Sequence, residues 1–133
     1  INAPTLLHAT MQFRQRRDLF FAGQITGVEG YMGNVATGLV AGINMARYLE
    51  GKPPITLPPT TMLGALCHYV SHAEPDTFQP MKANFGIMPD LDPHVKDKRQ
   101  RYLGYVKRAL ADLRAALAES DDPYLLPLPE ANS

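Results

Sequence analysis

A glycine-rich run with one polar amide contains the residue types that could do chemistry in this sequence. It holds glycines four and three residues apart, with a glutamine after the first and a tyrosine after the last: Gly23, Gln24, Gly27, Gly30 and Tyr31. Glycine lets the main chain approach a flat or anionic ligand closely. A helix beginning after such a run directs free N–H groups and the positive end of its dipole at that ligand. Many glycine-rich loops are only tight turns, so a ligand site and a plain turn both stay open at this point.

Two elements must position this run, a short apolar segment before it and a helix after it. Leu19–Ala22 has the length and aromatic content of a buried strand in a parallel sheet. The residues 34–49 have the apolar spacing of a helix, which Asn34 would cap and Gly51 would end. The side expected to face the core consists of Val35, Leu39, Ile43, Ala46 and Leu49.

The remaining chain reads as two further helices joined by extended segments. Residues 1–18 form a polar, partly extended lead-in, and residues 52–59 hold four prolines and predict a rigid linker. A second helix begins after Thr60 or Thr61 and runs to about His72. A third spans about 95–118, with an inward stripe predicted at Leu103, Val106, Leu110, Leu113 and Leu117.

This inventory of elements predicts part of a larger α/β domain. A single strand cannot make a sheet, and its edges need partners. The chain has 133 residues and begins at Ile1 rather than Met, so we expect the first strands to lie upstream. The predicted division is a strand–turn–helix unit over residues 1–51, a helical extension over 52–118 and a flexible acidic tail over 119–133.

Charge is balanced overall but not locally. Equal numbers of basic and acidic residues, 13 each, exclude a global signature for binding polyanions. Between Pro93 and Ala118, however, seven basic residues face two acidic ones. A smaller basic cluster consists of Arg14, Arg16 and Arg17. For both clusters, contact with an RNA backbone and an ordinary solvated surface remain alternative interpretations.

The other reactive residue types indicate no second site. A lone cysteine, Cys67, cannot form an internal disulfide and lies among apolar neighbours, so it is predicted to be structural. His68 and His72 lie four apart on the second predicted helix, but a zinc site needs a third ligand and no metal site is expected. No apolar run approaches the roughly 18 residues of a membrane span, and a cytoplasmic location is predicted.

The glycine-rich run also carries a resemblance to a known family. The sequence from Leu19 to Tyr31, LFFAGQITGVEGY, resembles the folate- and FAD-dependent tRNA uracil-5-methyltransferases called TrmFO. The likeness covers roughly residues 5–118 and continues through 36–39, 41–44, 58–61, 63–66, 78–81 and 83–86. The related GidA/MnmG proteins share Phe-Ala-Gly-Gln-Ile and Gly-Tyr, but usually read Asn-Gly-Thr-Thr-Gly-Tyr where this chain has Thr26–Tyr31, which favours the methyltransferase. At Lys82 the family tends to carry asparagine.

The resemblance implies a fold, a reaction and a set of contacts. The fold is the C-terminal part of a two-dinucleotide-binding-type FAD domain. The reaction takes a methylene group from methylenetetrahydrofolate, reduces it with NAD(P)H through FAD, and places a methyl group on C5 of a T-loop uridine in tRNA. The resemblance to the family's motif implies that the residues binding FAD are Gly23, Gln24, Ile25, Gly30 and Tyr31. The family's nucleophilic cysteines lie in its N-terminal portion, so no catalytic residue is expected here and the chain alone would be inactive.

Three interpretations are therefore carried forward. The first is a part of the methyltransferase that completes the flavin pocket with its missing N-terminal part. The second is a part of a GidA/MnmG-like wobble-uridine modification protein. The third is a non-catalytic helical module that binds RNA or a protein partner. Such a module would not require Gly23, Gly27 and Gly30 together with Gln24. Glu29 is equally suited to a ligand contact and to a backbone cap, and the oligomeric state is left open.

Overall fold

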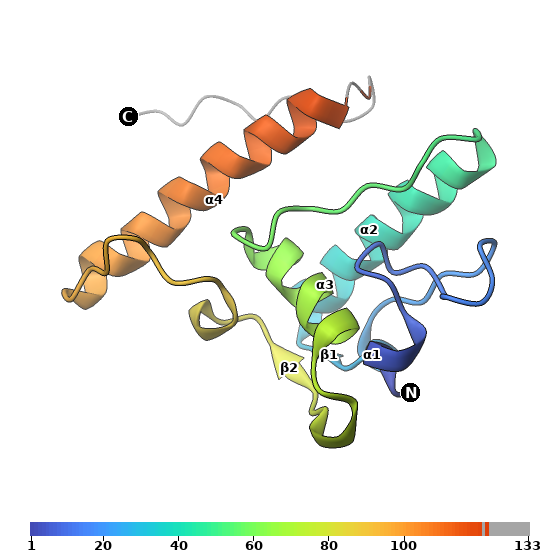
Figure 1. The fold of residues 1–133 in the computed structure, drawn as a ribbon, viewed down its shortest axis with the longest axis horizontal. Helices are drawn as coiled ribbons and strands as arrows, with labels where there is room; N and C mark the ends of the chain where they lie inside the picture. Colours follow the sequence, from blue (N-terminus) through green and yellow to red (C-terminus); the bar gives the residue numbers. More distant parts are fainter. Residues whose placement is uncertain (121, 123–133) are drawn as a thin grey trace.

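The computed structural model describes residues 1–120 and residue 122, so the predicted tail lies almost wholly outside the described residues. Within these residues, four helices and a pair of very short strands succeed one another (Figure 1). In chain order these are α1 (Ala3–Leu6), β1 (Val28–Glu29), α2 (Tyr31–Leu49), α3 (Met62–His72), β2 (Met81–Lys82) and α4 (Lys98–Ser120). Single 3-10 turns lie at η1 (Gln24–Thr26), η2 (Pro75–Thr77) and η3 (Phe85–Ile87).

A small parallel sheet joins two segments that are far apart in the sequence. β1 and β2 pair with Val28 opposite Met81 and Glu29 opposite Lys82. The coarse α/β class is therefore confirmed, as a mixture of helices with a two-stranded parallel sheet. The predicted strand does not belong to this sheet.

The segment Leu19–Ala22 is half-buried and is not a regular strand, contrary to the prediction. It lies antiparallel to residues 11–13, where the Phe13 N–H donates to the Leu19 carbonyl at 2.8 Å and the Phe21 N–H donates to the Met11 carbonyl at 3.0 Å. A parallel pairing requires a long crossover connection. Residues 14–18 instead form a short reversal, so the neighbouring segment can only be antiparallel.

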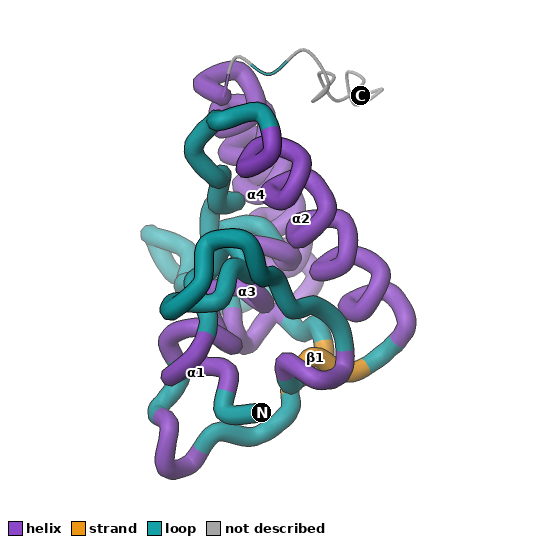
Figure 2. The backbone as a smooth tube through the Cα atoms, turned by 90° about the vertical axis from the view of Figure 1, so that its right-hand side faces the viewer, coloured by secondary structure: helices purple, strands orange, loops and turns teal. Residues whose placement is uncertain are grey.

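The main hydrophobic core lies where α1, α2 and α3 meet (Figure 2). Leu7 and Met11 are completely buried in it, so the expected polar lead-in is a structural part of the core. These apolar residues pack against α3 because α1 turns the chain back over that helix. The fully or largely buried members are Ala3, Leu7, Met11, Val28, Val40, Cys67 and Val70.

The linker and α3 follow the prediction closely. Residues 52–58 have no regular secondary structure, as the prolines require. Thr61 caps α3, since its Oγ1 accepts a hydrogen bond from the Gly64 N–H at 3.0 Å. A β-carbon at Gly64 would lie 2.0 Å from the Pro58 carbonyl oxygen, so glycine is needed where the linker crosses the helix.

Helix α2 begins earlier than predicted and turns the opposite face inward. Its cap is Gly30, and Asn34 lies in the first turn. The residues facing the core are Gly33, Thr37, Val40, Asn44 and Arg47. The predicted inward side is mostly open, with Val35 69%, Leu39 58% and Leu49 76% exposed.

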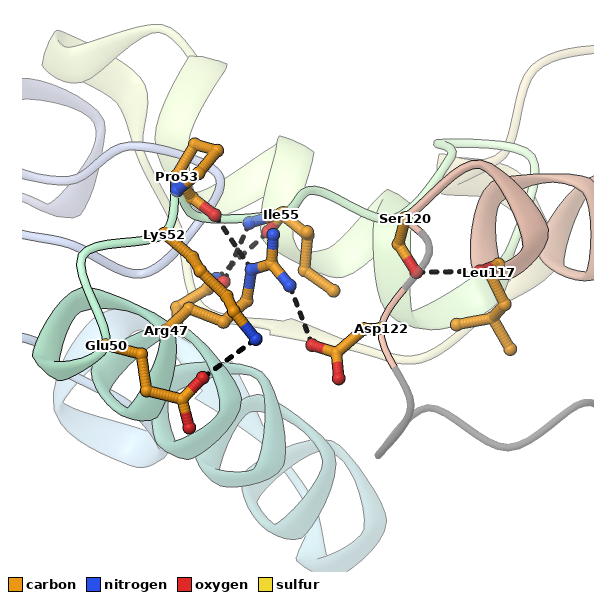
Figure 3. Close-up of polar contacts among 9 residues, drawn as sticks. Arg47, Glu50, Lys52, Pro53, Ile55, Leu117, Ser120 and Asp122 are labelled. Carbon is orange, nitrogen blue, oxygen red and sulfur yellow. Dashed lines mark hydrogen bonds and ion pairs between the residues drawn. The ribbon is translucent and has the colours of Figure 1, made fainter.

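Hydrogen bonds explain why polar residues of α2 face inward, and Figure 3 shows those of Arg47 with Pro53 and Asp122. The Asn44 Nδ2 donates to the carbonyls of Thr10 and Ile55 at 3.0 and 2.9 Å, and its Oδ1 accepts from the Ile55 N–H at 2.8 Å. Arg47 donates through Nε to the Pro53 carbonyl at 2.8 Å and pairs with Asp122 at 2.7 Å. The irregular segments that contain Thr10, Pro53 and Ile55 cannot pair all of their own backbone N–H and C=O groups. The side chains of Asn44 and Arg47 supply the missing hydrogen-bond partners.

Helix α4 lies along one edge of the molecule (Figure 1). Its prediction holds in the second half, where Leu113 and Leu117 line an apolar groove of about 210 Å³ with Leu39 and Ile43 of α2. It is wrong in the first half, because Leu103 and Val106 are 49% and 45% exposed. Tyr105 is buried there instead and stacks on Phe85 at a centroid distance of 5.2 Å, within a second, smaller core.

Candidate functional site

The glycine-rich run folds as a tight turn that delivers the chain to the N-terminus of α2. Gly23, Gly27 and Gly30 have φ values of 79°, 96° and 89°, a region that residues with a side chain rarely adopt. Gly27 is also needed for space, because a β-carbon there would lie 2.5 Å from the Phe78 ring. At Gly30, by contrast, no described atom beyond the adjoining residues lies within 4 Å of the place that a β-carbon would take, so the main chain is open on that side.

Two buried threonines hold this turn against α2. The Thr37 Oγ1 accepts from the Gly23 N–H at 3.1 Å and donates to the Gly33 carbonyl at 2.9 Å. The Thr26 hydroxyl donates to the Gly23 carbonyl at 2.7 Å. Both threonines are fully buried. Neither threonine was singled out from the sequence. A threonine on a helix, one turn after a glycine-rich loop, nevertheless indicates a possible side-chain hydrogen bond back to that loop.

A polar cleft of about 420 Å³ opens beside the start of α2. Its lining residues are Gln24, Glu29, Gly30, Tyr31, Asn34 and Lys82. Of the five residues predicted to bind a cofactor, Gln24, Gly30 and Tyr31 lie together here. Gly23 lies half-buried behind them beside Asn34, and Ile25 is 53% exposed and does not line the cleft.

The cleft has an electropositive side. The first N–H groups of a helix have no partner within it, and the dipole adds about half a positive charge at that end. Lys82 reaches the same cleft because β2 pairs with β1. Glu29 lies opposite Lys82 in the register and supplies an acceptor. The arrangement suits a planar, electron-rich group that carries both acceptors and donors.

Asn34 adds an amide to the cleft wall rather than a helix cap. Its Oδ1 is buried without a hydrogen-bond partner among the described residues, 3.8 Å from the position of a β-carbon on Gly23. An unpaired buried acceptor costs about 1–3 kcal/mol. Such a cost is relieved when the amide turns to meet a bound donor, so this observation fits a ligand with N–H groups.

The cysteine and the paired histidines form no comparable site. Burial raises the pKa of the Cys67 thiol to about 12, so it stays protonated and unreactive near neutral pH. The His68 and His72 rings stack with centroids 4.2 Å apart, and burial and then the His72 charge lower the pKa of His68. Across residues 1–120 and 122, no three or more His, Cys, Asp or Glu side chains gather in a way that could hold a metal ion.

Comparison with known proteins matches both the run and the wider chain. A family model described as "Glucose inhibited division protein A" (GIDA) matches residues 1–53, which include the turn and α2. A protein of Syntrophomonas wolfei named methylenetetrahydrofolate–tRNA-(uracil-5-)-methyltransferase TrmFO is 54% identical over 110 residues, which is 83% of this chain and 25% of the relative. Proteins of the same name in Synechococcus sp. CC9902 and Enterococcus faecalis are 53% and 50% identical over 94% and 92% of this chain, and 27% and 28% of their own lengths.

The chain thus spans about a quarter of the length of the curated relatives it matches. Among the described residues, no helix combines the length and apolar character needed to cross a membrane.

Proposed function

This chain belongs to the TrmFO family, which is related to GidA, and from that premise we propose that it is the C-terminal part of an FAD-dependent tRNA methyltransferase. The enzyme would methylate C5 of a T-loop uridine with methylenetetrahydrofolate and NAD(P)H. The name of the relatives states the folate, the tRNA and the uracil C5 position. Residues 1–51 would end the FAD domain and residues 52–118 would form its helical extension.

The observation that carries this proposal is the cleft at the start of α2. The cleft brings together the N-terminus of α2, the uncovered main chain at Gly30 and the side-chain amides of Gln24 and Asn34. Such amides complement the alternating N–H and C=O groups on the pyrimidine edge of a flavin. A volume of about 420 Å³ is in the range of a small-molecule site. These residues therefore fit FAD.

The role we assign to this chain is to bind and orient the flavin. Gln24 and Asn34 would hold its polar edge, and Tyr31, which is 93% exposed, would cover a face of the ring. The positive end of α2 and Lys82 would stabilise negative charge on the ring. Bound FAD would supply the hydride transfer that reduces the one-carbon unit. The nucleophile would come from upstream sequence, so the chain alone would be inactive.

The test uses the longer protein that carries this chain. We expect the purified protein to show the visible absorption of oxidised flavin and to transfer labelled carbon from methylenetetrahydrofolate to a T-loop uridine. Gln24→Ala and Tyr31→Ala should weaken flavin binding, measured by fluorescence titration of the apoprotein. Tyr48→Ala, at the other end of α2, is the matched control and should bind flavin normally. Equal flavin affinity in all three variants would refute the cleft assignment.

The GIDA match favours one alternative, a wobble-uridine modification protein. Mapping the modified uridine separates the two, because modification at the wobble position instead of the T-loop would support the alternative. A colourless protein that still binds RNA would support a non-catalytic module.

A further inference from the structure

The basic first half of α4 is a charged surface that the flavin cleft does not use. The exposed or half-exposed cations of this surface are Lys96, just before the helix, and Lys98, Arg99, Arg101 and Lys107 within it. Across residues 1–120 and 122, none of these five forms an ion pair within 4 Å. The acidic neighbour Asp97 accepts a hydrogen bond from the Gln100 N–H at 2.9 Å and so caps the helix. Most of the positive charge is therefore left for an external partner.

Lys98, Arg99 and Arg101 lie in the first turn of α4, which is the unfavourable end of a helix for positive charge. Positive charge near a helix N-terminus opposes the dipole, at a typical cost of about 0.3–1 kcal/mol for each exposed group. Lys98 and Arg101 lie over the Tyr102 ring, 5.6 and 5.8 Å from its centroid. These contacts hold the two side chains in place and leave their charge intact. This placement of positive charge destabilises the helix on its own. A bound anion would offset that cost.

The same face has an open hollow of about 530 Å³. Its lining residues are Asp97, Lys98, Arg99, Tyr102, Leu103 and Val106. Leu103 and Val106 are nearly half exposed and lie beside the cations on the outer side of the helix. The surface is thus a wide, shallow strip with mixed cationic, aromatic and aliphatic character, and not an enclosed pocket for a small molecule.

In the other basic cluster, Arg14 and Arg16 bond neighbouring protein groups and Arg17 is exposed. The Arg14 guanidinium donates to the Ser71 carbonyl at 3.1 Å and to the Pro4 carbonyl at 3.5 Å. Arg16 makes two hydrogen bonds to Asp18, at 3.0 and 2.8 Å. The two clusters therefore differ: Arg14 and Arg16 bond protein groups through their side chains, whereas the five cations at 96–107 make no ion pair within the described residues.

We propose that this face of α4, with Lys98, Arg99 and Lys107 as its phosphate contacts, binds the backbone of RNA. The inference rests on the proposed function, in which the RNA is the tRNA substrate. Charge complementarity favours this partner, because seven basic residues face two acidic ones between Pro93 and Ala118 in a chain with no net charge. Phosphate contacts of this kind position the RNA without reading its sequence.

The first test measures RNA binding by the full 133-residue chain. The probe is a fluorescein-labelled RNA hairpin with a uridine-containing loop, followed by anisotropy between about 50 and 200 mM salt. The variant Lys98→Gln/Arg99→Gln/Lys107→Gln should weaken binding about tenfold or more and reduce the slope of log affinity against log salt by about 2–3, since each lost phosphate contact removes about one. Glutamine is a good helix former, and circular dichroism should show α4 intact.

The matched control is Arg16→Gln/Arg17→Gln/Lys52→Gln, which removes the same amount of charge elsewhere. It should keep nearly the affinity and salt slope of the unmodified chain. Equal losses in both triple variants would reduce the effect to overall charge and overturn the proposal. Tighter binding to poly-glutamate than to the hairpin would assign the surface to an acidic protein and also overturn it.

A second readout separates this inference from the proposed function. In the longer protein, the α4 variant should retain flavin and raise the KM for tRNA with little change in kcat. A flavin-free, inactive longer protein whose α4 still binds RNA would refute the methyltransferase role and leave the RNA surface standing. Unchanged KM and unchanged RNA affinity in the α4 variant would refute the surface and leave the methyltransferase role standing.

Discussion

The two faces of α2 differ in chemistry and in surroundings. The face turned toward the core carries Thr37, Asn44 and Arg47, whose side chains bond backbone groups of three irregular segments or the helix itself. The open face carries Val35, Leu39 and Leu49, each more than half exposed. The comparison shows that burial here follows the need to satisfy backbone groups. Large exposed apolar patches usually mark contact surfaces, and we expect the open face to be covered in the longer protein.

The largest expected effect comes from removing the amide that connects the inner face to two segments. Asn44→Ala leaves the Thr10 carbonyl and both backbone groups of Ile55 without their partner. Each unsatisfied buried group costs about 1–3 kcal/mol, so we expect a loss of about 4 kcal/mol in the free energy of unfolding. Urea unfolding followed by circular dichroism measures it. Asn34→Ala, on the same helix, is the control and should change stability little.

The second prediction concerns the ion pair at the C-terminal end of the same face. Arg47 and Asp122 are 10% and 6% exposed at their side chains, and their N–O distance is 2.7 Å (Figure 3). Arg47→Met removes the ion pair with Asp122 and the hydrogen bond to the Pro53 carbonyl, and should cost about 2–3 kcal/mol. Asp122→Asn in the same background should restore part of that loss. A double-mutant cycle measures the coupling, and independent, additive effects would show that the pair does not connect residue 122 to α2.

A smaller effect is expected at the N-terminal end of the inner face. Thr37→Val removes the acceptor for the Gly23 N–H and should cost about 1 kcal/mol. Thr37→Ser keeps the hydroxyl and should be nearly neutral. In the longer protein the valine variant should also bind flavin more weakly, because the glycine turn loses its tie to α2. Normal flavin affinity would mean that the turn holds its shape without Thr37.

The smallest effect is expected on the open face. Val35→Ser and Leu49→Ser should change the stability of this chain by less than about 0.5 kcal/mol, as surface substitutions do. The same changes in the longer protein should destabilise it clearly, measured by its thermal midpoint. If neither protein responds, the open face is not a contact surface and the contrast between the two faces has no functional meaning.

Several elements could be predicted from sequence because their causes are local. Thr61 caps α3 and the prolines keep residues 52–58 extended, since capping and a fixed φ depend on neighbouring residues. The glycines mark the turn for the same reason, because three positive φ values require residues without a side chain. The resemblance added the expectation that Gln24, Gly30 and Tyr31 act together. The structure places these three at one cleft, and their role toward FAD remains a proposal.

The incorrect predictions of the inward faces and of the strand depended on which segments meet in the folded chain. Apolar spacing indicated that residues 34–49 form a helix with a preferred face, but the inward side was decided by Thr10, Pro53 and Ile55, whose backbone groups need Asn44 and Arg47. Leu19–Ala22 had the composition of a strand, but its partner was decided by the short reversal at 14–18.

The sequence by itself determined the three longer helices, the Thr61 cap of α3, the glycine turn and the local charge on α4, because these follow from the intrinsic preferences of each residue. Tertiary structure alone decided that Lys82 joins Gln24 and Tyr31 at one cleft, through the pairing of β2 with β1. It also decided that Arg14 and Arg16 bond protein groups whereas Lys98, Arg99 and Lys107 are exposed. Such outcomes depend on which backbone groups meet in space, and composition and spacing along the chain do not contain that information.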